Sequence, residues 1–210
     1  MFLNISLVLV KTTEMRSLTI ELMGMPKSGK TTQMDILGSN LQHAQGYKVR
    51  CIHEGARISP LDKEDYFMFN SWSFHNTLNR ILEAQLMDYD LILVDRGVYD
   101  HEAFTEALYR TERISQAQSL DTQRYFRYFR DIEDMAFLHL IDAETSIERE
   151  YKYERAKGRI LNLEFLRILY EVYLEMKDEI KKKLILIDGS KPIEENQKEI
   201  LASIQSKIKI

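Results

Sequence analysis

The chain has few cysteines, prolines and glycines, the residues that cross-link a protein or form flexible linkers. It carries one cysteine, Cys51, among 210 residues, which excludes an internal disulfide framework and favours a reducing, cytoplasmic compartment. Three prolines and eight glycines leave little sequence for flexible linkers. The apolar run at 2–10 is far shorter than the roughly 20 residues of a membrane span, and it lacks the basic start of a secretory signal. We expect no membrane partner.

The chain also lacks a large excess of one sign of charge, with 29 basic and 33 acidic residues. A formal net charge of −4 gives no general attraction to nucleic acid, so we expect no nucleic-acid partner and only local affinity for phosphate. With 44% hydrophobic residues, the chain is large enough for one substantial core. We expect a single domain over 15–210. Residues 1–14 form an N-terminal extension, which either precedes the fold or adds a short edge strand to it.

The most informative motif is a phosphate-binding loop. The segment GMPKSGKT at 24–31 matches the pattern G-x-x-x-x-G-K-[ST]. Glycine at 24 and 29 permits a backbone whose N–H groups converge on a phosphate. Lys30 supplies charge for the β- and γ-phosphates, and the Thr31 hydroxyl can bind Mg²⁺. The loop residues expected to bind ATP are Gly24, Lys27, Ser28, Gly29, Lys30, Thr31 and Thr32.

The flanking sequence supports this motif. Residues 18–23 are β-prone, whereas 31–45 read as a helix with Met34, Leu37 and Leu41 on one stripe. The loop therefore stands between a strand and a helix N-terminus, where the helix dipole favours an anion. A solvated lysine in a Gly/Ser turn is the alternative.

Acidic residues follow two further predicted strands. The strand at 47–52 leads to Glu54, which could take a proton from an attacking hydroxyl or be a solvated acid paired with His53 or Arg57. The apolar run at 89–94 ends at Asp95. In open α/β sheets ligands bind beyond the carboxyl ends of the strands, so both acids are expected near the phosphate loop.

The two residues at the end of the second of these strands have distinct expected roles. Asp95 is a candidate Mg²⁺ residue, directly or through water. Arg96 could fork onto a phosphate or onto Glu54. A structural ion pair is the plainer interpretation of an acid next to a base at a strand end.

An aromatic-rich segment at 65–87 has a helical pattern. Trp72 and Phe74 are core residues by default, but an aromatic cluster near a nucleotide site can also stack on a base. Asn70, His75 and Asn76 could read the edge of that base.

The rest of the chain continues the alternation of helices and strands. We expect helices at 100–110, 121–135 and 162–182, helix signals from 144, strands at 137–141 and 183–188, and a last helix after Pro192. Five strands alternating with helices predict an α/β fold, a three-layer, doubly wound parallel sheet. Residues 149–159 carry five cations, which indicates either a phosphate-facing helical lid or an ordinary charged helix face.

Together these motifs resemble the thymidylate kinase and deoxynucleoside kinase group of P-loop kinases. The similarity rests on the loop, Glu54, Asp95-Arg96, the lid arginines Arg149 and Arg155, and the Asp188-Gly189-Ser190 turn, and Trp72-Ser73-Phe74 also looks like the aromatic stretch of deoxynucleoside kinases. The resemblance implies a sheet of order 2-3-1-4-5, transfer of the ATP γ-phosphoryl group, adenine near Ser190, and a homodimer formed through helices such as 67–86.

The sequence departs from that group around the acceptor. Gly97 replaces a usual serine or tyrosine, Asp100 stands where a serine often follows, and Gly55 replaces the usual proline. The segment at 53–57 looks closer to P-loop kinases of small acceptors such as ribosylnicotinamide kinases. The reaction class is unaffected by these changes, whereas the acceptor is left open.

We therefore expect an ATP- and Mg²⁺-dependent kinase acting on a nucleoside or a nucleoside monophosphate. The residues expected to carry the catalysis are Lys30, Glu54, Arg96, Arg149 and Arg155. The residues expected to contact the acceptor are Glu54, Arg57, Trp72, Asn76 and Arg96, with Arg57 and Arg96 holding the phosphate if the acceptor is a monophosphate. The alternative is a P-loop NTPase or regulatory switch without a small acceptor.

Overall fold

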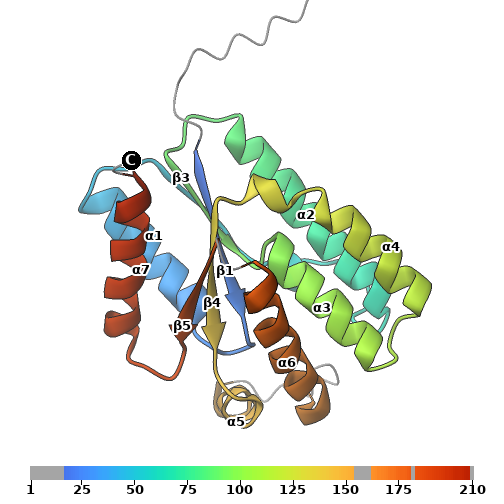
Figure 1. Cartoon of the computed structure of the whole chain (residues 1–210). Helices are drawn as coiled ribbons and strands as arrows, with labels where there is room; N and C mark the ends of the chain where they lie inside the picture. The colour runs from blue at the N-terminus through green and yellow to red at the C-terminus, as the bar shows by residue number, and fades with distance from the viewer. Residues whose placement is uncertain (1–16, 154–161, 181–182, 209–210) are drawn as a thin grey trace, which may run out of the picture.

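The computed structural model describes residues 17–153, 162–180 and 183–208. A parallel sheet of five strands, in the order β2-β3-β1-β4-β5, runs through the middle of the molecule (Figure 1). The strands are β1 (Leu18–Gly24), β2 (Val49–Ile52), β3 (Leu91–Asp95), β4 (Met135–Leu140) and β5 (Leu184–Asp188). The sheet order is the one that the resemblance to P-loop kinases implies, and because the strands are parallel, the carboxyl ends of β1, β2 and β3 lie at one edge.

Helices cover both faces of the sheet (Figure 1). On one face lie α1 (Lys30–His43) and α7 (Ile193–Ile208), and on the other lie α2 (Tyr66–Gln85), α3 (Val98–Arg110) and α6 (Leu163–Glu179). The helix α4 (Gln116–Arg127) packs outside α2 and α3, and α5 (Ala143–Tyr153) follows β4. Two short 3₁₀ turns, η1 (Gly55–Arg57) and η2 (Arg130–Ile132), complete the described elements.

The alternation of side chains along β1 divides the core between the two faces. Ile20 and Leu22 pack with α1 and α7, whereas Met23 packs with α3 and α6. Glu21 shares the second face with Met23 and is fully buried there beneath the start of α3. This carboxyl group belongs to the candidate site described below.

One predicted element is wrong. The helix expected at 121–135 instead begins at Gln116, because Ser115 and Gln118 form a capping box, and it ends at Arg127. Met135 is the first residue of β4, where it pairs with Ile20 of β1. The sequence alone does not separate the end of the helix from the start of the strand, because the apolar residues here are too few to show an unambiguous period.

Among the residues that the structure describes, no helix combines the length and the apolar character needed to cross a bilayer.

Candidate active site

The phosphate loop has the backbone that its glycines permit. Gly24 and Gly29 have φ values of 126° and 92°, and Lys27 has a φ of 58°. A Cβ atom on Gly24 would lie 2.1 Å from the carbonyl oxygen of His139, so only glycine fits there. Lys30 Nζ donates to the carbonyl oxygens of Gly24 at 2.9 Å and Met25 at 2.8 Å. Burial, with repulsion from a neighbouring arginine, lowers the pKa of Lys30 to about 8.

Thr31 and Asp95 meet at the start of α1. The Thr31 hydroxyl donates to Asp95 Oδ2 at 2.5 Å, while Asp95 Oδ1 is buried without a hydrogen-bond partner. Burial raises the pKa of Asp95, although Lys30 and Arg96 oppose the shift. A hydroxyl beside a carboxylate with one unengaged oxygen is a donor set that suits Mg²⁺.

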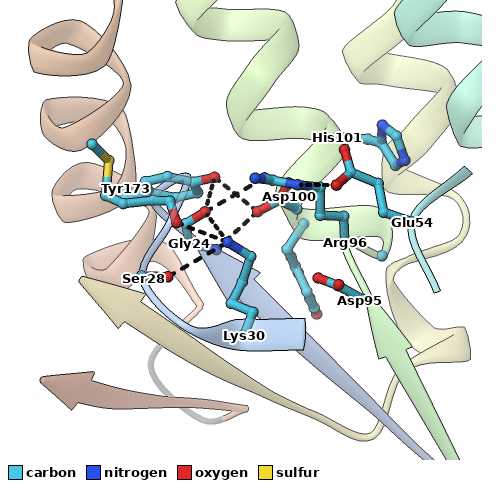
Figure 2. A network of polar contacts seen from close by, with 12 residues as sticks. Gly24, Ser28, Lys30, Glu54, Asp95, Arg96, Asp100, His101 and Tyr173 are labelled. Atoms are coloured by element: carbon cyan, nitrogen blue, oxygen red, sulfur yellow. Dashed lines mark hydrogen bonds and ion pairs between the residues drawn. The ribbon is translucent and has the colours of Figure 1, made fainter. Parts of the chain in front are cut away.

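Arg96 lies at the centre of a polar network between the loop and the helices (Figure 2). Its Nε lies 3.2 Å from Glu54 Oε2, and its Nη1 donates to Asp100 Oδ2 at 2.6 Å. Burial alone would lower the pKa of Arg96, but the two carboxylates raise it well above its ordinary value, so the guanidinium stays charged. These partners hold Arg96 at a φ of 65°, which is uncommon outside glycine.

Asp100 joins this network to the phosphate loop. Its Oδ1 accepts from the backbone N–H of Gly24 at 2.9 Å and from the Tyr173 hydroxyl at 2.7 Å. Burial tends to raise the pKa of Asp100, yet Arg96 and Lys30 lower it below its ordinary value. The acid that replaces the usual serine here is thus an ionised carboxylate on α3 that connects this helix to α6 and to the phosphate loop by hydrogen bonds.

A pocket opens beside Glu54 and Arg96, between α2 and α3. It is partly open, and the empty space in it, including the solvent at its mouth, is about 470 Å³. One wall comes from residues spaced by three or four along α2 and the opposite wall from α3. The lining residues are Glu54, Ala56, Tyr66, Phe69, Asn70, Ser73, Arg96, Asp100, His101, Phe104 and Leu108.

Two buried carboxyl groups lie beneath the first turn of α3. Glu21 accepts from the N–H groups of Gly97 at 2.7 Å and Asp100 at 2.9 Å, and Glu133 accepts from that of Val98 at 2.9 Å. A Cβ atom on Gly97 would lie 1.9 Å from Glu133 Oε1 and 2.9 Å from Glu21 Cδ. The glycine that departs from the resembling kinases is therefore needed to admit this acid pair.

The far side of the loop contacts α5 and the turn after β5. Arg149 Nη1 donates to the carbonyl oxygens of Lys27 and Gly189, both at 3.1 Å. Lys27 itself pairs with Glu150 at 3.1 Å. The Ser190 hydroxyl donates to Asp188 at 2.5 Å in the same turn. Arg149 thus links the predicted phosphate and adenine regions.

Most of the residues singled out in the sequence gather here. Lys30, Thr31, Asp95, Arg96 and Glu54 surround one corner of the sheet, with Gly24, Lys27, Ser28, Gly29, Thr32, Arg149 and Ser190 along the loop, the start of α1 and the neighbouring turn.

Two of the expected acceptor residues lie beside Gly55, which stands between the lining residues Glu54 and Ala56. Trp72 and Asn76 are not among the described residues that line the pocket, and they pack against Gly55 instead. The Arg57 side chain and all of Arg155 lie outside the described part of the structure, as do lid positions 154–159.

Several residues of the site escape sequence reasoning. Asp100 and Gly97 stand out only as departures from a resembling group, while Glu21, His101 and Tyr173 carry no motif. A charged residue inside an otherwise apolar strand, as Glu21 is, is the one available signal, since an acid at such a position needs a buried partner.

Comparison with known proteins supports the fold. No family model matches the chain. Two solved structures of deoxyadenosine kinase from M. mycoides, one with dCMP and dCDP and one with dATP, align at TM-scores of 0.70 and 0.67. Each is 16% identical, and the alignment covers 90% of this chain and 100% of that one.

A curated relative matches only locally. The catalytic polypeptide of DNA polymerase epsilon from Candida glabrata is 31% identical over 61 residues, which are 29% of this chain. Because the chain spans 3% of that polymerase, the match carries no statement about activity. The chain therefore has the P-loop kinase fold of the deoxyadenosine kinase structures, with the sheet order 2-3-1-4-5 that the resemblance implies.

Proposed function

We propose that the protein is an ATP-dependent nucleoside kinase, which transfers the γ-phosphoryl group of ATP to a hydroxyl of a nucleoside. The observation that carries this proposal is the junction of three parts: the phosphate loop, the Glu54–Arg96 ion pair and the pocket beside them. Arg96 Nη1 lies 3.4 Å from the Gly24 carbonyl oxygen, so the pocket adjoins the loop. The deoxyadenosine kinase structures of the same fold support this reaction class.

The charges around the pocket favour a nucleoside over a nucleoside monophosphate. Arg96 is the cation among the described lining residues, and Glu54 and Asp100 already neutralise it. A phosphate would have to displace one of these carboxylates or depend on Arg57. An uncharged sugar and base, in contrast, would contact lining residues that include the aromatic side chains of Phe69 and Phe104, without such a cost.

Each polar residue has a role in the transfer. Glu54, whose side chain is 39% exposed, accepts the proton of the acceptor hydroxyl, and that oxygen attacks the γ-phosphorus as the bond to the leaving ADP breaks. Lys30 and Arg96 offset the charge on the transferred group. We assign the same role to Arg149 and to Arg155, which lies outside the described residues. Gly24 and Gly29 leave room for the phosphates at the loop.

Mg²⁺ fits the pair formed by Thr31 and Asp95, since Asp95 Oδ1 is buried without a partner and a cation would satisfy it. When bound, the ion would neutralise charge on the β- and γ-phosphates. The low cysteine content supports a cytoplasmic reaction. We also place a homodimer contact at α2 and α4, which expose apolar side chains.

A regulatory NTPase is the competing function. It lacks support from the pocket, because hydrolysis without an acceptor needs no pocket between α2 and α3. The two functions differ in whether ADP forms only when an acceptor is present.

The test of Glu54 is its replacement by glutamine, which preserves shape and removes the base. In E54Q, kcat should fall by about 10²–10⁴-fold, the range for a general base, while the Kd for ATP stays close to that of the wild type. The matched control is E64Q, since Glu64 is exposed and outside the pocket. Equal kcat values in E54Q and the wild type would exclude Glu54 as the base.

A further inference from the structure

His101 lines the pocket, and the residues behind it determine which of its ring nitrogens carries the hydrogen. Thr105 Oγ1 lies 2.8 Å from the carbonyl oxygen of His101 and 2.8 Å from Asn70 Nδ2. A hydroxyl has a single hydrogen, and the carbonyl can only accept it. Thr105 must therefore donate to the His101 carbonyl and accept from the amide NH₂ of Asn70.

This arrangement fixes the orientation of the Asn70 amide. With Nδ2 directed at Thr105, Asn70 Oδ1 faces His101 Nδ1 at 3.2 Å. Because Oδ1 can only accept, Nδ1 must carry the ring hydrogen. Burial lowers the pKa of His101 to about 4, so the ring is neutral near pH 7 and has one N–H. Nε2 is then a bare acceptor.

The other surroundings of His101 hold the ring without engaging Nε2. Phe74 and Phe126 contact the ring edge to face, with centroids 5.8 Å and 6.4 Å away. Within the described part of the chain, Nε2 has no hydrogen-bond partner. It is also not one of the fully buried polar atoms without a partner, so it is accessible to solvent. His101 lines the pocket, and we infer that the accessible Nε2 opens into it.

We propose that His101 determines acceptor specificity by accepting a hydrogen bond from an N–H group of the nucleobase, with Asn70 and Thr105 as the residues that position its ring. The proposal rests on the proposed nucleoside kinase function. A base whose N–H groups are methylated would leave Nε2 buried and unpaired, which disfavours that acceptor by roughly 10–100-fold in kcat/KM.

The kinetic test compares two acceptors in each variant. For the parent nucleoside that the wild type phosphorylates best, the ratio of its kcat/KM to that of the N-methylated analogue is measured; thymidine with N3-methylthymidine and deoxyadenosine with N6,N6-dimethyldeoxyadenosine are such pairs. We expect a ratio of about 10–100 in the wild type, near 1 in H101L, and mostly restored in H101Q, whose amide oxygen can accept. A fold defect alone would lower both acceptors equally.

Two outcomes separate the proposals. A ratio in H101L equal to that of the wild type would overturn the role of His101 and leave the kinase function intact. Phosphorylation of no nucleoside by the wild type would overturn both.

A second measurement does not depend on turnover. Long-range ¹H–¹⁵N spectra at pH 7, with H101L to assign the signal, should show Nδ1 protonated and Nε2 bare, and N70L should shift the ring toward the Nε2–H tautomer. A dominant Nε2–H tautomer in the wild type would contradict the proposal.

Discussion

At the scale of single residues, the buried pair of Glu21 and Glu133 raises the question of which carboxyl group is protonated. Both are fully buried, and both face the same backbone turn. Burial raises the pKa of Glu21 well above its ordinary value, Glu133 adds repulsion, and the pKa of Glu133 rises to about 7. Glu133 Oε2 has no partner unless a proton bridges the pair. We infer that Glu21 carries this proton.

This proton gives a prediction for stability. The folded acids have raised pKa values, so the folded protein keeps a proton that the unfolded chain releases, and stability should fall as the pH rises above about 4.5 and until it passes the raised pKa of Glu21. For one proton the slope is about 1.4 kcal/mol per pH unit. Glu21→Gln replaces the protonated acid with a neutral group of the same shape and should flatten this slope, as urea denaturation at several pH values would measure.

The alanine variant provides the contrast. Glu21→Ala leaves the N–H groups at the start of α3 without an acceptor and should lower the free energy of unfolding by about 1–3 kcal/mol at pH 7. A slope in Glu21→Gln as steep as in the wild type would show that the pair shares no proton.

Residues of the site are predictable where chemistry is local in sequence. Lys30, Thr31 and Asp95 belong to short motifs with a known physical purpose, and the structure brings them together. Asp100 and Tyr173 come together only through packing of α3 against α6, 73 positions apart, and no local pattern contains that contact.

At the scale of elements, two helix starts carry a clear signal in the sequence. The phosphate loop indicates the start of α1, and Asn162 caps α6 by accepting from the N–H of Phe165. The segment between α3 and β4 is harder to assign because Glu133 interrupts its apolar pattern. That acid faces Glu21 of β1, 112 residues away, so its role depends on the tertiary fold.

The surface of α2 and α4 supports a prediction about assembly. Leu82 on α2 is 43% exposed, and the residues that directly follow α2 and α4, Leu86 and Tyr128, are 77% and 78% exposed. We expect a dimer in sedimentation velocity for the wild type and a monomer for the double variant L82K/L86K, because lysine would bury charge in the interface. I36K, an exposed apolar position on α1, is the matched control and should remain dimeric.

A monomeric wild type at micromolar concentration would exclude this homodimer, and dimers in L82K/L86K would place the contact elsewhere.

At the scale of the whole molecule, the architecture follows from alternation and one motif. Five β-prone runs separated by helices leave few topologies once crossovers are right-handed, and the resemblance that the phosphate loop and the other motifs carry implies the order 2-3-1-4-5. The acceptor cannot be predicted in the same way. Its pocket is built by one face of α2 and one face of α3, and the choice of face depends on how these helices pack.

If the protein is a nucleoside kinase, its ATP turnover depends on a nucleoside acceptor. The most direct measurement is ADP release by the purified protein with Mg²⁺-ATP, across nucleosides, nucleoside monophosphates and nicotinamide riboside, against a control without acceptor. We predict release above the control with one or more nucleosides, little release with monophosphates, and none in K30A. Equal release with and without every acceptor would contradict the kinase function and indicate an NTPase.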